Sequence, residues 1–565
     1  MFSKQEKSRS GQSRQPFFVR YRPVVIPEQG RLFIAMAGFS LFFVIIAMRL
    51  VDLGGVQSTA TITARVSSVS QVIARPDILD RHGSLLATDV KTAALYANPS
   101  EVLDVEDVVD KLMTVLPDLD AKSLTKKLSK KNSKFAWVKR RIPPKDEERI
   151  LSLGLVGLHF SHEPQRAYPV GNLTSHALGY VDIDNRGQGG IERHIDKIAG
   201  VYFPKVNKDD LKPIFEVSID LGVQHILRQE LSKAIKTYRA KAASGIIMDV
   251  TSGEVIAMSS LPDFDPHKQK QALEKKRLDR NTNGIFELGS IFKVVTTAMA
   301  LDTGVANINS VFDASRPIVL GKSRIRDYHG KGRPLNVEEV FIYSSNIGSA
   351  KMADRVGIAR HKAFLGKLGL LTAMETELGR HQAPMKPQNW TRLSTMTIGF
   401  GHGLSVSPLQ FVAATASLVN GGYYVTPTFR KRSRADGRAK AKKVLKSATS
   451  NEIRQLLRLN VVKGTGRRAD APGYRVGGKT GTAEKAENGR YNTNKLLTSF
   501  ISVFPSDDPA YVVLVMLDEP QPGPGQKSRP TAGTNAAVVT SNLISQVGSK
   551  LGVIPQQKNV ALSRK

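Results

Sequence analysis

Three short motifs in the second half of the chain carry residue types that suit serine-based acyl transfer. A serine hydroxyl is a weak nucleophile until a neighbouring group takes its proton, and a lysine can take it only when burial or a nearby cation lowers its pKa. Ser290 and Lys293 are three residues apart after a glycine, which places both on one face of a helix start. The sequence therefore predicts Ser290 as the nucleophile and Lys293 as its base. The motifs are, in chain order, Ser290-Ile291-Phe292-Lys293, Ser344-Ser345-Asn346 and Lys479-Thr480-Gly481-Thr482.

The second and third motifs supply groups that such a reaction needs around the serine. Ser344 is predicted to relay a proton to the leaving amine, and Asn346 to orient Lys293 and hold a substrate amide. Lys479 adds a second positive charge, which suits a substrate carboxylate and helps to lower the pKa of Lys293.

The residues after Lys479 are expected to form the edge of a sheet that binds an extended peptide. Thr480, Gly481 and Thr482 combine small side chains with a glycine that permits close backbone approach. The backbone N–H groups of Ser290 and Thr482 are the expected oxyanion hole. Lys479 to Thr482 are thus predicted to bind the substrate.

Each motif alone also has an ordinary structural explanation. Ser290 suits a helix N-cap, and Ser344 with Asn346 suits a turn. The Ser-x-x-Lys spacing occurs again at Ser123 to Lys126, although no glycine precedes that serine. The order and combination of the three motifs make the purely structural interpretation the weaker one.

The elements that position these motifs show strands at both ends of one region and helices between them. A helix is expected over Ser290 to Thr303 and another near Ala536 to Lys550. This pattern predicts an α+β domain with one antiparallel sheet, built from both ends of the region and covered by helices. The expected strands are Ala243 to Val250, Glu254 to Ser260, Leu497 to Phe504 and Ala510 to Leu517.

An apolar run near the N-terminus predicts a membrane anchor. Leu32 to Met48 is apolar apart from Ser40, and seven cationic residues against two acidic ones precede it. The positive-inside rule then places residues 1–31 in the cytoplasm and the bulk of the chain outside, with a single-pass signal anchor over 32–53. A cleaved signal peptide is the alternative, but the nearest small-x-small site, Ser58-Thr59-Ala60, lies about ten residues beyond the run.

Length and composition divide the rest of the chain and suggest its neighbours. A chain of 565 residues predicts several domains: a non-catalytic module over 56–215, the catalytic domain over 222–552 and a tail over 553–565. The net charge of +32 suggests an anionic neighbour, and two basic segments, 122–149 and 430–446, are candidates for contact with anionic lipid or wall polymer. Nucleic acid is not expected, because no basic-aromatic run of the kind that stacks bases is evident. The absence of cysteine excludes disulfides and thiolate metal sites.

The three motifs and several further segments resemble the class B penicillin-binding proteins. The Ser-x-x-Lys, Ser-Ser-Asn and Lys-Thr-Gly set is shared by penicillin-binding proteins and β-lactamases. Around the nucleophile, Glu287-Leu288-Gly289-Ser290-Ile291 departs from the usual Glu-Pro-Gly-Ser-Thr. The Ser-Ser-Asn form is similar to the division-specific, FtsI-type branch. The other matching segments are Arg75 to Gly83, Arg166 to Gly171, Gly189 to Glu192, Ile398 to Gly401 and Ser407 to Gln410.

This resemblance implies a D,D-transpeptidase that cross-links peptidoglycan at the division septum and binds β-lactams as inhibitors. The implied fold is an elongated non-catalytic module followed by a penicillin-binding transpeptidase domain, anchored in the cytoplasmic membrane. The implied partners are stem peptides, nascent glycan strands, a polytopic glycosyltransferase of the FtsW type and other divisome proteins. No cofactor and no metal are expected. The alternatives are an elongation-specific transpeptidase, a D,D-carboxypeptidase, a β-lactamase, and a non-catalytic β-lactam sensor or division scaffold.

Overall fold

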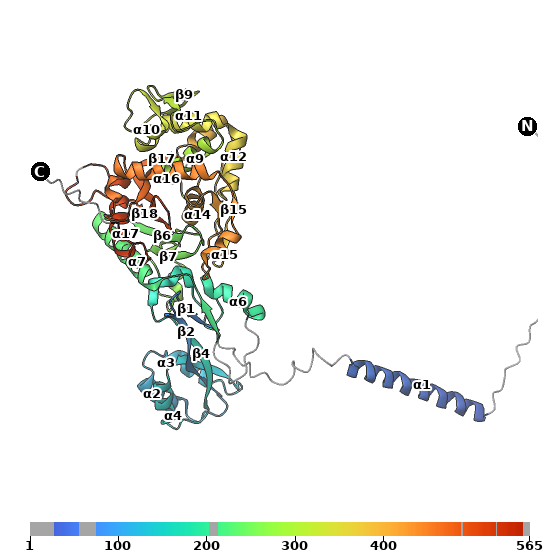
Figure 1. Ribbon diagram of the computed structural model, residues 1–565. Helices are drawn as coiled ribbons and strands as arrows, with labels where there is room; N and C mark the ends of the chain where they lie inside the picture. The colour runs from blue at the N-terminus through green and yellow to red at the C-terminus, as the bar shows by residue number, and fades with distance from the viewer. Residues whose placement is uncertain (1–27, 56–74, 203–212, 488–489, 527, 557–565) are drawn as a thin grey trace, which may run out of the picture. The chain divides into compact units, whose positions relative to one another are not determined.

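The computed structural model describes residues 28–55, 75–202, 213–487, 490–526 and 528–556 (Figure 1). The chain divides into two units, residues 1–72 and 73–565. The first contains helix α1 (Glu28–Gly55), which includes the predicted anchor. Of the helices in the described ranges, none meets the combination of length and apolar character that membrane crossing requires. Most of the predicted cytoplasmic tail, residues 1–27, and most of the predicted C-terminal tail lie outside the described residues.

The N-terminal part of the second unit is a sheet module built around one long strand. The strand β2 (Leu85–Ala97) pairs with β1 (Asp77–Leu79), β3 (Ala136–Ile142) and β4 (Leu158–Ala167), and β5 (Ile214–Glu216) pairs in parallel with β1. Three short helices close a small apolar core against it, among whose residues are Leu95, Leu112 and Leu128 (Figure 1). These helices are α2 (Val105–Val115), α3 (Ala121–Leu128) and α4 (Pro144–Leu151).

Charged residues of the module's sequence motifs meet in one buried cluster. Glu192 is fully buried and accepts Arg166 Nε at 2.7 Å and Arg75 Nη2 at 2.9 Å. Asp89 forms a second ion pair with Arg166, through Arg166 Nη1 at 3.1 Å. Such ions are tolerated in an interior only when they are paired and hydrogen-bonded. These motif residues therefore hold the module together and lie outside the catalytic chemistry.

The C-terminal part of this unit contains a five-stranded sheet in the order β16-β17-β18-β6-β7, with every pairing antiparallel. This confirms the predicted antiparallel sheet drawn from both ends of the region. The strands are β6 (Ala242–Asp249), β7 (Val255–Leu261), β16 (Gly477–Glu487), β17 (Arg490–Phe504) and β18 (Tyr511–Asp518).

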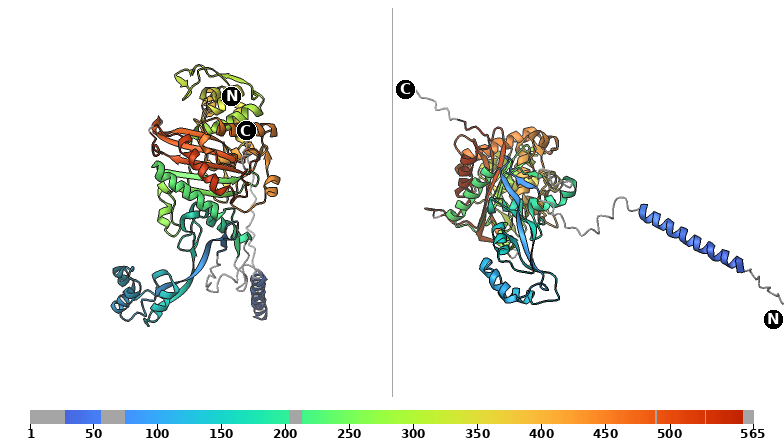
Figure 2. Two further views of the ribbon diagram at one scale, coloured as in Figure 1. Left: turned by 60° about the vertical axis from the view of Figure 1, so that its left-hand side comes forward. Right: turned by 90° about the horizontal axis from the view of Figure 1, so that it is seen from below.

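Helices cover both faces of this sheet (Figures 1 and 2). Neighbouring residues of β6 belong to different cores, because successive side chains of a strand point to opposite faces. Ile247 packs with α7 (Leu221–Tyr238) and α17 (Ala536–Val547), whereas Ile246 packs in the larger core with α9 (Lys293–Asp302) and α14 (Pro408–Val419). A third helix, α16 (Ser447–Val462), contributes Ile453 to the larger core.

The helix expected over Ser290 to Thr303 begins differently from the prediction. Its first turn is a 3₁₀ turn, η4 (Gly289–Phe292), and α9 starts only at Lys293. A tighter first turn is common at helix starts. Here it begins at Gly289, whose φ of +57° only glycine adopts without strain.

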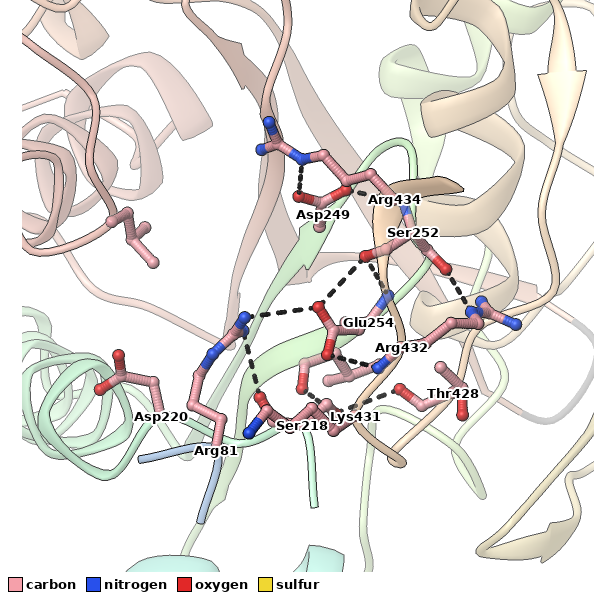
Figure 3. A network of polar contacts seen from close by, with 12 residues as sticks. Arg81, Ser218, Asp220, Asp249, Ser252, Glu254, Thr428, Lys431, Arg432 and Arg434 are labelled. Atoms are coloured by element: carbon pink, nitrogen blue, oxygen red, sulfur yellow. Dashed lines mark hydrogen bonds and ion pairs between the residues drawn. The ribbon is translucent and has the colours of Figure 1, made fainter. Parts of the chain in front are cut away.

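A polar network joins the module to the edge of the catalytic sheet (Figure 3). Glu254, which precedes β7, is buried and accepts Arg432 N at 2.9 Å, Ser252 Oγ at 3.3 Å and the module's Arg81 Nη2 at 3.4 Å. Arg81 also donates to the backbone oxygen of Ser218 at 3.5 Å.

The basic segment 430–446 contributes to this junction through several of its cations. Arg434 pairs with Asp249 at 2.9 Å, and Arg432 Nε donates to the Ser252 carbonyl at 2.6 Å (Figure 3). Arg438 lies 3.2 Å from the ring centroid of Tyr423. The contact of this segment with lipid or wall polymer stays a prediction, and these cations already have partners within the fold.

Candidate active site

The turn Gly289–Phe292, called the nucleophile turn after the predicted nucleophile Ser290, is shaped by close contacts between backbone segments. A side-chain carbon placed on Gly401 would lie 2.0 Å from the Gly289 carbonyl oxygen, so the segment Ile398 to Gly401 must keep its glycine. A carbon on Gly481 would lie 2.6 Å from the Leu288 oxygen. Leu288, where the family usually has proline, is buried and packs in the larger core. Half-buried Ser290 is thus held between the edge strand and the segment 398–401.

Lys293 is the centre of the site, and its amine contacts three of the predicted residues, Ser290, Ser344 and Asn346. Its Nζ lies 3.0 Å from Ser290 Oγ, 3.0 Å from Ser344 Oγ and 2.8 Å from Asn346 Oδ1. It also donates to the Ser344 carbonyl at 2.6 Å. Burial lowers the pKa of Lys293 well below its usual value, the charge of Lys479 lowers it further, and Asp327 opposes the shift. A neutral amine in this position can accept the hydroxyl proton of Ser290.

Ser344 lies between the two lysines. It occupies the turn between α10 (Val337–Ile342) and α11 (Asn346–Val356), with a positive φ of 58°. Its hydroxyl is 3.0 Å from Lys293 Nζ and 3.0 Å from Lys479 Nζ. A hydroxyl can accept one proton while it donates another, so this geometry provides a path for a proton between amine and leaving group.

Lys479 is fully buried on strand β16, and burial lowers its pKa to about 7. Within the described residues, β16 pairs with β17 alone and is the edge of the sheet, as predicted. Thr480 Oγ1 is hydrogen-bonded to Thr465 at 2.7 Å, and Thr482 Oγ1 accepts Ala532 N at 3.2 Å. All eight residues predicted from the three motifs are therefore brought to one place, while Ser123 lies in α3 of the module.

Two acidic residues beside the site were not predicted from the sequence. Asp327 accepts Ser345 Oγ at 2.8 Å and Ile347 N at 2.9 Å, and so holds the residues on both sides of Asn346. The backbone carbonyl of Arg326, the residue before Asp327, accepts a hydrogen bond from Asn346 Nδ2 at 3.0 Å. The amide of Asn346 is consequently oriented with its oxygen toward Lys293. In the sequence, Asp327 is marked only by its position before Ser-Ser-Asn. It belongs to none of the three motifs.

Glu287, three residues before the nucleophile, ties the hairpin β16–β17 to the loop after Gly401. Its carboxylate accepts Tyr491 Oη at 3.0 Å and Gly403 N at 2.8 Å. Burial, followed by the charge and hydrogen bond of Glu287, raises the pKa of Tyr491 above its ordinary range. Across the described ranges, no group of His, Asp and Glu side chains is arranged to hold a metal ion.

Comparisons with known proteins identify the family of both domains. The penicillin-binding protein transpeptidase domain matches residues 243–542, and the penicillin-binding protein dimerisation domain matches residues 71–198. The chain is 36% identical to the probable peptidoglycan D,D-transpeptidase FtsI of Caulobacter vibrioides over 95% of this chain and 91% of that protein. It is 29% identical to the peptidoglycan D,D-transpeptidase FtsI of Escherichia coli over 81% of each chain.

Solved structures show the same fold. Penicillin-binding protein 3 of Mycobacterium tuberculosis, solved with aztreonam, has a TM-score of 0.65 and 23% identity over 86% of this chain and 97% of that one. The match of both domains and the near full-length relationship to FtsI proteins lead to one conclusion. The chain belongs to the class B penicillin-binding proteins of the FtsI type.

Proposed function

We propose that this protein is a peptidoglycan D,D-transpeptidase that cross-links stem peptides through an acyl-enzyme on Ser290. The observation that carries the proposal is the buried amine of Lys293, 3.0 Å from Ser290 Oγ and 3.0 Å from Ser344 Oγ. No ordinary structural role explains a lysine with a strongly lowered pKa that contacts two hydroxyls and no carboxylate within the described residues.

In the acylation half-reaction, neutral Lys293 takes the proton of Ser290 as Oγ attacks the carbonyl carbon of the penultimate D-alanine. The N–H groups of Ser290 and Thr482 hold the oxyanion that forms. Collapse of the tetrahedral intermediate breaks the C–N bond, and the leaving D-alanine amine takes a proton from Ser344. Ser344 recovers that proton from Lys293, so the amine is neutral again.

In the second half-reaction, an amine of a neighbouring stem peptide attacks the ester on Ser290. Its proton travels through Ser344 to Lys293, and Lys293 returns a proton to the departing Ser290 oxygen. Lys479, with the edge strand Thr480 to Thr482, binds the donor peptide and its terminal carboxylate. The acceptor amine must outcompete water, which would otherwise give carboxypeptidase chemistry.

The domain division and membrane placement are part of the proposal. Residues 56–215 form the non-catalytic module and 222–552 the transpeptidase domain, with a signal anchor over 32–53. The anchor is supported by the basic residues that precede it and by large exposed apolar side chains of α1, among them Phe33 and Phe39. By family, the protein acts outside the cytoplasmic membrane at the septum, with an FtsW-type glycosyltransferase and other divisome proteins as partners.

A fluorescent penicillin tests the nucleophile directly. Its ring carbonyl resembles the D-Ala-D-Ala amide, so we expect a stable adduct on the peptide that contains Ser290. Ser290→Ala should abolish the adduct, and Ser123→Ala, which alters the other Ser-x-x-Lys sequence, should leave it unchanged. Folded protein that forms no adduct would contradict the proposal and favour a non-catalytic scaffold.

A further inference from the structure

An exposed aromatic cluster lies in the module, far along the sequence from the catalytic motifs. Tyr96 on the central strand β2 is in register with Trp137 on β3 and with His159 on β4. The ring of Tyr96 stacks on Phe135 at 5.0 Å and on His159 at 5.4 Å, while Trp137 meets Tyr96 edge-on at 6.1 Å. Three rings on neighbouring strands thus form one row across the sheet, and Phe135, just before β3, joins them by stacking on Tyr96.

The cluster lies on the face of the sheet that the module's helices leave uncovered. Leu95 and Ala97, the neighbours of Tyr96, point into the core formed with α2, α3 and α4. Phe135 is 48% exposed and Trp137 39% exposed. Cross-strand aromatic pairs stabilise a sheet, but buried rings would do this equally well. The exposure of these rings therefore indicates a binding role.

Cations surround these rings. Arg140 lies 5.4 Å from the ring centroid of Trp137, and Lys127 Nζ donates to the Trp137 carbonyl at 3.1 Å. Lys134 directly precedes Phe135, and its ammonium pairs with no carboxylate in the part of the chain that the structure describes. Residues 122–149 contain eleven Lys and Arg against three acidic residues. The cluster therefore attracts an anionic partner.

Carboxylates interleaved with the cations favour a hydroxyl-rich polymer over a lipid surface. Glu101 accepts from His159 at 3.0 Å, and Asp118 pairs with Lys139. Glu163 accepts Arg140 at 2.7 Å beside the rings. Such acids repel a continuous sheet of anionic headgroups but can accept hydrogen bonds from sugar hydroxyls, while the C–H face of a sugar ring packs on an aromatic face.

We infer that this aromatic cluster, formed by Tyr96, Phe135, Trp137 and His159, is a second binding site, for an anionic glycan strand. The rings contact the faces of the sugars, and Lys127, Lys134 and Arg140 contact their carboxylates. The site is separate from the transpeptidase site, which the proposed function assigns to the stem peptide. It would hold a stretch of strand that has lost its stem peptides, because the lactyl carboxylate of a sugar is free only where no stem peptide is attached.

The sequence offers a direct probe, because Trp137 and Trp390 are its only tryptophans. In a Trp390→Phe variant of the full chain, acylated beforehand with penicillin, the emission of Trp137 can be titrated with glycan strands freed of stem peptides by an amidase. Each disaccharide then keeps its lactyl carboxylate but offers nothing for the transpeptidase site. We expect saturable binding with a change in Trp137 emission.

Variants separate the contributions of rings and charges, with sedimentation of labelled strands as the measurement. Phe135→Ala with Trp137→Ala should weaken binding on the order of tenfold. Leu103→Ala with Leu151→Ala, which removes two exposed side chains elsewhere in the module, should not. Lys127→Gln with Lys134→Gln should weaken binding more than Lys233→Gln with Lys236→Gln on α7. Penicillin acylation, measured on each variant, shows that it is folded and tests the proposed function separately.

Three results would overturn the inference. They are the absence of binding to peptide-free strands, equal binding by the double aromatic variant, and quenching of Trp137 by brominated lipid in vesicles that carry the reconstituted chain. The last would assign the cluster to the membrane surface.

Discussion

Keeping both buried lysines of the site protonated at the same time costs free energy. Each lies 3.0 Å from the same hydroxyl, of Ser344, and burial lowers the pKa of both. Interacting groups of this kind lose their protons in steps that belong to the pair. The proposed mechanism needs Lys293 neutral as the base and Lys479 charged for the substrate carboxylate.

This requirement predicts a bell-shaped pH dependence for the acylation rate constant with a fluorescent penicillin. The rate should rise with pH as Lys293 loses its proton, and fall above about 7 as Lys479 becomes neutral. Removing a nearby positive charge raises the pKa of a lysine, so Lys479→Ala should move the rising limb to higher pH. The prediction fails if the rising limb is the same in wild type and variant.

Asp327 is predicted to be a positioning residue that acts through Asn346. Asp327→Asn keeps the shape but weakens the two contacts that hold the residues beside Asn346, so the acylation rate should fall on the order of tenfold. The reason is a less well oriented Lys293, so the pH profile should also shift. Asp313→Asn, at the exposed last residue of β8 (Val311–Asp313), is the matched control. An unchanged pH profile together with a lower melting temperature of Asp327→Asn would indicate a purely structural role.

The sequence predicted the motif residues because acyl transfer demands particular residue types at short spacing, as in Ser290 and Lys293. It did not predict Asp327, which acts through backbone and side-chain contacts 18 and 20 residues further along the chain. It also missed the aromatic cluster. Phe135 and Trp137 stand among basic residues in the sequence, but Tyr96 and His159 join them only when three strands pair.

At the scale of elements, the nucleophile turn depends on how closely separate segments approach it. The segment Ile398 to Gly401 follows α13 (Arg392–Ile398) and reaches the turn η4 through Gly401, while Thr296 of α9 donates to the Gly399 carbonyl at 2.7 Å. The strand β16 reaches the same turn from the other side through Gly481. Three elements therefore fix the position of Ser290.

Gly401→Ala is expected to displace the nucleophile turn. The new carbon would overlap the Gly289 carbonyl oxygen, and the φ of +98° at position 401 disfavours alanine as well. A displacement of about 1 Å can lower a catalysed rate on the order of 100-fold, and we expect that loss in penicillin acylation. Gly403→Ala is the control, because its φ is +89° but its nearest contact is 3.4 Å away. Equal losses in both variants would attribute the effect to backbone conformation alone.

The apolar strands of the catalytic sheet were predictable, since each is a short and largely apolar run next to turn residues. The prediction of Leu497 to Phe504 was too short, because β17 begins at Arg490. Its first residues are polar and form a hairpin with the end of β16, so neither hydrophobicity nor alternation marks them. The 3₁₀ start at η4 was missed because it depends on the contact of Gly289 with distant segments.

At the scale of the whole molecule, the proposed anchor makes a claim about the side of the membrane on which each part lies. The chain has no cysteine, so a single introduced cysteine reports its own location. In intact cells made permeable only at the outer envelope, Ser129→Cys should react with a membrane-impermeant maleimide. Ser10→Cys should react only after lysis. Labelling of both residues before lysis would contradict a signal anchor with a cytoplasmic N-terminus.

The junction around Glu254 has a mechanical consequence. Arg81 of the module contacts Glu254, which directly precedes β7, and β7 and β16 are opposite edges of the sheet. A pull on the module by a membrane-bound partner would therefore load the edge farthest from Ser290 first. Three strands, β6, β18 and β17, separate that edge from β16, so a force applied to the module would reach the edge that holds Lys479 only through them.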